Sequence, residues 1–352
     1  MAYKNDFDEY KLLGEPEKAE KSEIWQTAIG LQQVDGLTPS EYLIETAKQN
    51  IEGEITFYEV QERLNGYYKA KPVNRAADDR TEEADKVSAR IAEILSEKTF
   101  SFSPAEYITI HKRLFTGIYK FAGKIRDYNI SKSEWVLNGE TVYYASADSI
   151  RATLDYDFGQ EKTFQYKGLA KEQIVEHIAK FVSGIWQIHA FGEGNTRTTA
   201  VFTIKYLRTF GFTVTNDLFA DHSWYFRNAL VRANYNDYKS NIYSTFEYLN
   251  HFFGNLLLGG STPLKNRDLR VGTQSEADVP VNVPVKNQNV PVKRKDEILK
   301  QLLVNPHLTV GELAALFSVA DKTIKRDIAT LKNEGKVSRV GSDKTGHWEV
   351  LQ

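Results

Sequence analysis

Residue types that can handle phosphate gather in one short stretch, WQIHAFGEGNTRTTAVF, residues 186–202. His189, whose side chain has an unperturbed pKa of about 6.5, is suited to take a proton from a hydroxyl nucleophile. Glu193 offers the hard oxygen ligand that Mg²⁺ uses when it bridges phosphates. Asn195 and Arg197 can donate hydrogen bonds to phosphate oxygens. Each residue alone could simply cap a helix or form a turn, but together they predict a phosphate-handling site.

The same stretch is predicted to be a loop between two buried helices. The apolar residues before it have helical spacing and form one stripe: Ile174, Ile178, Phe181, Ile185 and Ile188. After the loop, residues 201–207 continue this pattern until Gly211, a suitable C-terminal stop. Gly192 and Gly194 have no Cβ, so the backbone can approach a ligand at the helix N-terminus, where free N–H groups attract anions.

Composition restricts the classes of function. The chain has 352 residues, which predicts two or three domains, and its net charge of −2 gives no overall attraction to nucleic acid or membrane. The absence of cysteine excludes disulfides, thiolate catalysis and cysteine-ligated zinc. The N-terminus has no apolar signal-peptide core and no run of 18 apolar residues follows, so we expect a cytoplasmic protein that makes no membrane contact.

Changes in composition divide the chain into four segments. Residues 1–72 and 73–258 are mainly helical in period, and 259–293 form a linker before a C-terminal module at 294–352. Residues 262–293 contain four prolines and three Val-Pro-Val triplets. We favour an extended linker over an edge strand here, because the prolines would remove ladder donors.

Local signals place helix starts in the first segment. Thr38 followed by Pro39 predicts a helix start, with Thr at the cap and Pro in the first turn. Thr56 followed by Glu59 predicts a capping box for the third helix. A different signal lies in SEWVLNGETVYYA, residues 133–145, where Asn-Gly between two β-rich arms predicts a β-hairpin.

The C-terminal module has the element order of a winged helix-turn-helix: three helices with a turn at SVAD, residues 318–321, and then two short strands. Its third helix carries the predicted DNA contacts Lys322, Lys325 and Arg326. From residue 293 onward there are eleven Lys or Arg and eight Asp or Glu, a local net charge of about +3. Such a module can also serve protein interaction or dimerisation, so a homodimer stays open.

The loop resembles the signature of the Fic/Doc (fido) superfamily, His-x-Phe-x-Asp/Glu-Gly-Asn-Gly-Arg-x-x-Arg. The matching positions are His189, Phe191, Glu193, Gly194, Asn195 and Arg197. The resemblance extends upstream to LFTGIYKFAGKIRDYNI, residues 114–130, and covers roughly residues 85–255. It implies a mainly α fold, an all-helical Fic core with a β-hairpin flap, to which the N-terminal helical region and the α+β winged helix are added.

The resemblance also implies a reaction, the transfer of AMP from ATP to a hydroxyl side chain of a target protein. His189 would deprotonate the hydroxyl, and Glu193 would hold Mg²⁺ on the phosphates. Asn195 and the loop amides around Gly194 would cradle the α-phosphate, and Arg197 would neutralise the departing pyrophosphate.

Two positions depart from the family signature. Thr196 replaces the second glycine but keeps its N–H donor next to the nucleotide, and Ala200 replaces the second arginine, which usually grips the γ-phosphate. Tyr225 and Asn228 lie where family members build the adenine pocket, although an aromatic residue there is more often core. Because the second arginine is missing, a Doc-like kinase is an alternative function. Such a kinase binds ATP in the reverse sense and transfers phosphate.

The N-terminal region resembles the small antitoxin partners of Fic toxins, whose inhibitory helix carries Ser/Thr-x-x-x-Glu-Gly. Asp35 and Gly36 stand at the Glu-Gly position, and Glu52 followed by Gly53 is a second candidate. We favour Asp35. Because residue 200 is alanine, the usual inhibitory pair cannot form, and Asp35 could reach Arg197 instead, or regulation could be relaxed.

The sequence therefore predicts a Fic-type protein adenylyltransferase that uses Mg²⁺ and ATP and is regulated by its N-terminal region. Its partners would be ATP, a hydroxyl-bearing target protein and DNA. Two alternatives stay open: a Doc-like protein kinase, and a DNA-binding regulator whose Fic domain senses nucleotide without catalysis.

Overall fold

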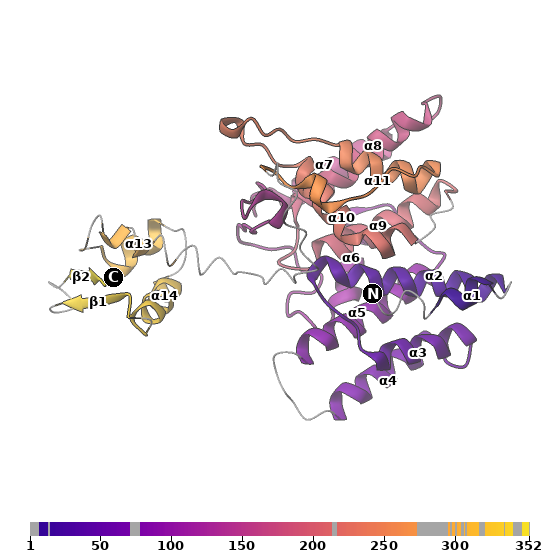
Figure 1. Cartoon of the computed structure of the whole chain (residues 1–352), viewed down its shortest axis with the longest axis horizontal. Coiled ribbons are helices and arrows are strands. Elements are labelled where there is room, and N and C mark those ends of the chain that lie inside the picture. The colour runs from indigo at the N-terminus through magenta and orange to yellow at the C-terminus, as the bar shows by residue number, and fades with distance from the viewer. Residues whose placement is uncertain are drawn as a thin grey trace. The chain divides into compact units, whose positions relative to one another are not determined.

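The structure is a computed structural model in which the chain forms two compact units, residues 1–285 and 286–352 (Figure 1). It describes residues 7–12, 15–70, 78–212, 217–272, 295, 298–299, 301–303, 306, 308–316, 321–333, 335–340 and 347–351. The Val-Pro-Val triplets and residues 318–320 of the predicted turn lie outside the described residues, and the last residue of that turn, Asp321, begins a helix. Among the described helices, none has both the length and the apolar composition needed to cross a membrane.

The first unit begins with the helices of the N-terminal region. They are α1 (Asp8–Leu12), α2 (Pro16–Gly30), the 3₁₀ helix η2 (Leu31–Asp35), α3 (Glu41–Glu52) and α4 (Phe57–Ala70). Helix α2 runs directly into η2, and its buried residues Trp25 and Ile29 belong to the same hydrophobic core as the helices that follow. The N-terminal region is thus packed into the first unit and is not a separate body.

The predicted helix starts were only partly correct. The capping box is confirmed, because the Thr56 hydroxyl accepts from the Glu59 N–H at 3.2 Å and Glu59 accepts from the Thr56 N–H at 2.7 Å. Helix α3, however, is capped by Ser40 and not by Thr38, since the Ser40 hydroxyl accepts from Leu43 N–H at 3.2 Å. Ser40 takes the cap because its own N–H is held by Asp85 at 2.8 Å, a contact distant in sequence.

The rest of the first unit is a helical bundle. Its elements are α5 (Asp78–Ser96), α6 (Pro104–Phe115), η3 (Trp135–Leu137), α7 (Ile150–Thr163), α8 (Lys171–Ile188), α9 (Asn195–Thr209), α10 (Asp217–Ala233), η4 (Tyr238–Ser240), α11 (Glu247–Leu258) and η5 (Asn266–Leu269). The predicted helices on both sides of the loop are confirmed as α8 and α9.

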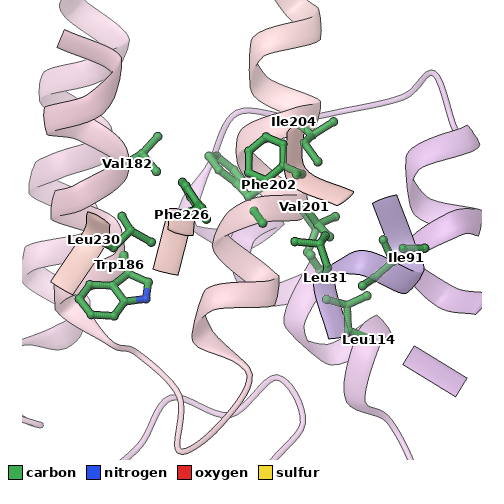
Figure 2. Close-up of a cluster of buried hydrophobic side chains, with 14 of the residues drawn as sticks. Leu31, Ile91, Leu114, Val182, Trp186, Val201, Phe202, Ile204, Phe226 and Leu230 are labelled. Carbon is green, nitrogen blue, oxygen red and sulfur yellow. The ribbon is translucent and has the colours of Figure 1, made fainter. Parts of the chain in front are cut away.

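Helix α9 is the centre of this bundle. Every residue from Asn195 to Leu207 is buried, so α9 is covered on all sides. Figure 2 shows the apolar residues that surround it, contributed by η2, α5, α6, α8 and α10: Leu31, Ile91, Leu114, Val182, Trp186, Phe226 and Leu230. A helix packed on all sides holds the loop at its N-terminus in a fixed position.

The predicted β-hairpin at 133–145 was wrong in its arms and correct in its turn. Asn138 and Gly139 both have positive φ, 55° and 93°, as the Asn-Gly signal requires. The arms are not strands: Trp135–Leu137 is a 3₁₀ helix, and the turn is closed by the Gly139 N–H, which donates to Glu134 O at 2.9 Å. We call residues 131–145 the flap.

Part of the predicted linker packs against the flap. Leu269 and Val271 are buried, Val271 N–H donates to Val136 O at 2.9 Å, and the Asn138 side chain donates to Val271 O at 2.7 Å. Residues 264–272 therefore belong to the structure that holds the flap, and not to an extended spacer.

The second unit has a core of its own. It contains α13 (Val310–Leu316), α14 (Asp321–Asn333) and an antiparallel pair, β1 (Val337–Val340) and β2 (His347–Val350), with Val337 opposite Val350. These are the only strands in the part of the chain that the structure describes. Trp348 and Ile324 lie in the core that joins the strands to α14. The described elements, two helices followed by two strands, have the order predicted for the end of a winged helix, and the first predicted helix lies partly outside the described residues.

Candidate functional site

The predicted loop joins the end of α8 to the start of α9, and its two ends have left-handed backbone conformations. His189 caps α8 with φ 50°, and Gly194 precedes α9 with φ 78°. A Cβ on Gly194 would lie 2.4 Å from the Phe115 ring, and one on Gly192 would lie 2.6 Å from the Tyr128 hydroxyl. Gly194 is therefore required by the buried Phe115 ring and by its positive φ, whereas at Gly192 the obstructing Tyr128 hydroxyl is the far end of an exposed side chain that can shift.

Asn195 fixes the shape of the loop. Its side-chain oxygen accepts from Phe191 N–H at 3.0 Å, and its side-chain nitrogen donates to Phe191 O at 2.7 Å. The side chain is buried, so this reciprocal pair closes the loop from inside. The predicted phosphate contact of Asn195 is left with one side-chain N–H. Its main role in this structure is to position the loop.

His189 is a buried imidazole held between two rings. Tyr144 of the flap lies with its ring centroid 4.2 Å from the imidazole, and Trp186 packs edge-on at 5.3 Å. Burial lowers the pKa of His189 well below its usual value, and the positive charges of Lys132 and Arg227 lower it further. The imidazole is therefore neutral at physiological pH, the form in which it can accept a proton.

Thr196, the residue that departs from the glycine of the family signature, has a defined contact. Its hydroxyl accepts a hydrogen bond from the Trp186 indole N–H at 3.0 Å. Because Trp186 packs on His189, Thr196 holds one of the two rings that enclose the imidazole.

Arg197 is enclosed by acidic and polar partners. Its Nε lies 2.8 Å from Asp35 Oδ2, one terminal nitrogen lies 2.6 Å from Glu83 Oε1, and the other donates to Gln32 Oε1 at 3.0 Å. The guanidinium also lies over the Phe115 ring at 4.8 Å. Burial by itself lowers the pKa of Arg197, but the neighbouring anions raise it above its usual value, so the side chain is a cation.

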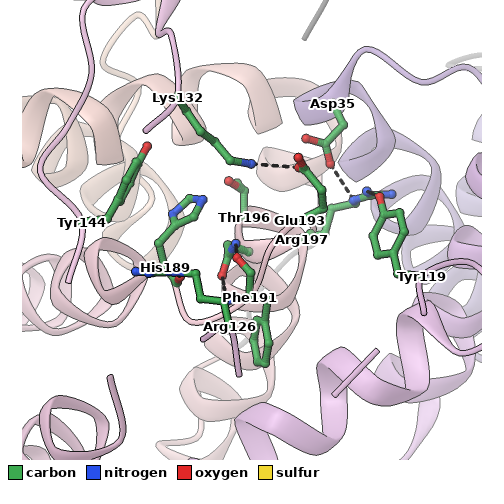
Figure 3. Close-up of polar contacts among 12 residues, drawn as sticks. Asp35, Tyr119, Arg126, Lys132, Tyr144, His189, Phe191, Glu193, Thr196 and Arg197 are labelled. Atoms are coloured by element: carbon green, nitrogen blue, oxygen red, sulfur yellow. Dashed lines mark hydrogen bonds and ion pairs between the residues drawn. The ribbon is translucent and has the colours of Figure 1, made fainter. Parts of the chain in front are cut away.

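Of the two inhibitory candidates, only Asp35 contacts the loop helix. Asp35 ends η2, followed by Gly36 with φ 64°, and pairs with Arg197 (Figure 3). Glu52, the second candidate for the inhibitory position, pairs instead with Lys18 Nζ at 2.8 Å. The inhibitory effect of Asp35 stays a prediction.

Glu193, the predicted metal ligand, is paired with a lysine of the flap. Its Oε2 lies 2.8 Å from Lys132 Nζ, and the two side chains are 38% and 22% exposed. No group of three or more His, Asp or Glu that could hold a metal occurs among the described residues. Mg²⁺ bound with nucleotide phosphates needs only one or two carboxylates from the protein, and Glu193 as its ligand stays a prediction. An accessible carboxylate that already holds a cation suits that role.

Tyr225 and Asn228, the remaining predicted nucleotide contacts, form no hydrogen bond with the loop among the described residues. Tyr225 is buried in the core, and Asn228 donates to Asn266 Oδ1 at 2.9 Å. Ala200 is completely buried and makes room for core packing. The roles of Tyr225 and Asn228 therefore stay predictions.

Sequence reasoning missed the residues that reach the loop from distant segments: Gln32, Glu83, His111, Arg126 and Lys132. Arg126 donates from Nε to His189 O at 2.8 Å and thereby supports the strained cap of α8. Glu83 lies at an acidic helix start whose pattern is typical of a solvent-exposed face, so nothing in its local sequence indicated that it contacts the loop. Lys132 stands directly before the Asn-Gly turn region, which was a usable signal for proximity to the site.

His111 links α6 to the loop. Its Nδ1 accepts from Gly123 N–H at 2.9 Å, so Nε2 carries the proton and donates to Glu193 O at 3.0 Å. The ring stacks on Phe191 with centroids 3.7 Å apart. Burial lowers the pKa of His111 to about 4.

This buried histidine predicts a pH dependence of stability. Between pH 6.5 and about 4 the unfolded chain binds a proton at His111 that the folded chain refuses, so the free energy of unfolding falls as pH falls. In His111→Gln the slope of the unfolding free energy against pH should be smaller, by an amount that corresponds to up to about one bound proton. Urea unfolding of both proteins across this pH range measures the difference, and parallel curves would contradict the assignment.

In the second unit, the predicted DNA contacts lie on one helix. Lys322, Lys325 and Arg326 belong to α14, and Lys325 is exposed. Helix α14 occupies the third-helix position, which a winged helix-turn-helix uses to read DNA.

Comparison with known proteins gives matches for both units. Residues 101–207 match the Fic/DOC family, and residues 294–341 match the DeoR-like helix-turn-helix domain. The chain is 26% identical over 132 residues to protein adenylyltransferase VbhT of Bartonella schoenbuchensis, a match that covers 38% of this chain. It spans only 25% of the length of that relative.

Solved structures of Bartonella effector proteins are similar at low identity. The N-terminal FIC domain of Bep8 from Bartonella sp. 1-1C is 18% identical with a TM-score of 0.41, covering 52% of this chain and 87% of that chain. BepC from Bartonella tribocorum with bound AMPPNP is 19% identical with a TM-score of 0.40, covering 52% and 88%.

Proposed function

Because the chain carries a Fic/DOC domain at residues 101–207, we propose that it is a protein adenylyltransferase, which transfers AMP from ATP to a hydroxyl side chain of a target protein. The observation that carries the proposal is the buried neutral imidazole of His189 next to a helix-entry loop that contains Glu193 and Gly194. The match to an adenylyltransferase supports the same reaction class.

In the proposed mechanism His189 takes the proton of the target hydroxyl, and the hydroxyl oxygen attacks the α-phosphorus. The bond from the α-phosphorus to the oxygen shared with the β-phosphate breaks, and pyrophosphate leaves. The N-terminus of α9 presents unpaired backbone N–H groups to the α-phosphate. Glu193 would hold Mg²⁺, which supplies positive charge to the phosphates. Arg197 would stabilise the leaving group once it is released from Asp35.

The N-terminal region is the proposed regulator. As long as Asp35 and Gln32 of η2 hold Arg197, the side chain of Arg197 is 1% exposed. A cation that is already paired and buried has little to offer a phosphate, so the described arrangement corresponds to a restrained form.

The position of the transferred phosphate distinguishes the candidate functions. The protein and its Asp35→Ala variant are incubated with Mg²⁺ and ATP labelled at the α or the γ phosphate, with His189→Ala as the control and cell extract as the source of targets. Because kinases of the extract transfer γ-phosphate themselves, only label that is lost with His189→Ala is counted. We expect such His189-dependent label from the α position only. His189-dependent label from the γ position only would replace this proposal with the Doc-like kinase. No such label in either protein would favour the nucleotide-sensing regulator.

For the second unit we propose DNA binding, favoured by the helix-turn-helix match and the exposed Lys325 on α14. Lys325→Ala should weaken binding to duplex DNA and reduce the dependence of log K on log salt by about 0.9, the loss of one phosphate contact. Fluorescence anisotropy at several salt concentrations measures this. Lys171→Ala, which removes an exposed lysine from the first unit, is the matched control. Equal slopes for the two variants would contradict the assignment.

A further inference from the structure

The described site is short of cations that could bind a triphosphate. Position 200 is a buried alanine, and Arg197 is taken up by two carboxylates and Gln32. Arg126 donates its hydrogen bonds to backbone carbonyls, including those of His189 and Tyr128. ATP carries several negative charges next to the bond that breaks, so some other group must meet them.

Among the described residues at the loop, Lys132 is the cation whose contacts are the easiest to exchange. Its ammonium has one ion-pair partner, Glu193, at 2.8 Å. Both side chains are partly exposed, so the pair is open to solvent and to a ligand. Figure 3 shows Lys132 extending from the flap to Glu193, with Arg197 beyond it. The charge of Lys132 also reaches the imidazole, since it contributes to the lowered pKa of His189.

The backbone that carries Lys132 is fixed from several directions. The Lys132 N–H donates to Thr141 Oγ1 at 3.1 Å. Two residues later Glu134, 1% exposed, pairs with Arg227 of α10 at 2.6 Å. The Asn138 turn is held by residue 271. A rigid flap with one long flexible side chain aimed at the loop can move its ammonium by a few ångström without any change in the fold.

We infer that Lys132 is the phosphate-positioning residue of this site and that it takes the place of the missing second arginine. On nucleotide binding its ammonium leaves the Glu193 carboxylate for the β- and γ-phosphates, and the carboxylate receives Mg²⁺. Every charge stays paired through this exchange: the carboxylate replaces one cation with another, and the ammonium replaces one anion with another. The exchange therefore avoids the penalty of an unpaired charge at a partly buried site.

The inference rests on the proposed use of ATP, and binding measurements separate the two. Isothermal titration calorimetry with the full chain measures the affinity for the non-hydrolysable analogue AMPPNP and for AMP, both with Mg²⁺. The variants are Lys132→Met, which keeps the length of the side chain, and Lys132→Arg, which keeps the charge. Lys124→Met, at an exposed lysine just before the flap, is the matched control. All are tested in the native chain and with Asp35→Ala, so that a restrained Arg197 does not hide binding.

We expect Lys132→Met to weaken AMPPNP binding about tenfold, equivalent to about 1.4 kcal/mol, and to change AMP binding less than twofold. Lys132→Arg and Lys124→Met should bind AMPPNP with nearly the affinity of the proteins they are made from. Equal loss for AMP and AMPPNP would overturn the inference, because the lysine would then act at the α-phosphate or through the fold. Unchanged or tighter AMPPNP binding in Lys132→Met would overturn it as well and leave the proposed function intact. No AMPPNP binding in either parent would refute the use of ATP itself, and the inference with it.

Discussion

Replacing Asp35 with alanine should raise the rate of AMP transfer by about tenfold or more. Asp35 and Arg197 form an ion pair between a 33% exposed and a 1% exposed side chain. Exposed ion pairs contribute about 0.2–1 kcal/mol and breaking a buried one costs about 3–5 kcal/mol, so this pair lies between the two, and each 1.4 kcal/mol corresponds to a factor of ten. The variant loses the Asp35 contact on Nε of Arg197 but keeps Glu83, so the guanidinium stays charged and ordered. Its Nε edge then becomes available to phosphate.

Glu52→Ala is the matched control for this activation. Glu52 is also a carboxylate before a glycine in the N-terminal region, but it pairs with Lys18 and not with Arg197. Initial rates at saturating ATP should be unchanged in Glu52→Ala and raised in Asp35→Ala. Asp35→Asn should be intermediate, because it keeps a polar side chain of the same size beside Nε while the charge is lost. Equal rates in Asp35→Ala and the native chain would contradict the assignment of η2 as the inhibitory segment.

The release by Asp35→Ala should be incomplete, for a reason visible in the remaining contacts. Gln32 of η2 still accepts from Arg197 at 3.0 Å. The Gln32 oxygen carries no net charge, so it should hold the guanidinium less strongly than the Asp35 carboxylate does, and Gln32→Ala should add a smaller increment to Asp35→Ala. Glu83 lies on α5, outside η2, and keeps the arginine neutralised in both variants.

What could be predicted from sequence depended on how local the cause was. The capping box at Thr56, the apolar stripe of α8 and the positive φ of Asn138 and Gly139 follow from residues within one or two turns of each other. The prediction of strands on both sides of the Asn-Gly turn was wrong because tertiary contacts outweigh local strand preference here. Val136 and Leu137 are buried, and Val136 O accepts a hydrogen bond from Val271 N–H.

The chemistry of the loop was predicted in its residue types and incompletely in its partners. The motif positions do lie together at the start of α9. Arg197 and Gln32, however, are 165 positions apart in sequence, and Lys132 and Glu193 are 61 apart. Pairs at such separations carry no periodic or capping signal, so only the folded chain reveals that both charged groups of the loop are already paired.

Gly194→Ala should be the most destabilising single change in the loop, at about 3 kcal/mol. An L residue in the left-handed region costs about 1–2 kcal/mol, and Gly194 has φ 78°. The added Cβ would also lie 2.4 Å from two atoms of the Phe115 ring, which is packed in the core and stacks under Arg197. Overpacking of this kind costs roughly 1–3 kcal/mol. Calorimetry of the full chain should show the main transition of the first unit lowered by roughly 6–10 °C.

Gly211→Ala separates the two causes. Gly211 follows the other end of the same helix with almost the same φ, 77°, but a Cβ there has nothing within 4 Å. It should therefore show only the backbone cost, about 1 kcal/mol. Adding Phe115→Leu to Gly194→Ala should recover part of the steric cost relative to Phe115→Leu alone, and none of the backbone cost. If Gly194→Ala and Gly211→Ala were equally destabilised, the Phe115 ring would have room to move, and the loop would be less tightly held than its contacts indicate.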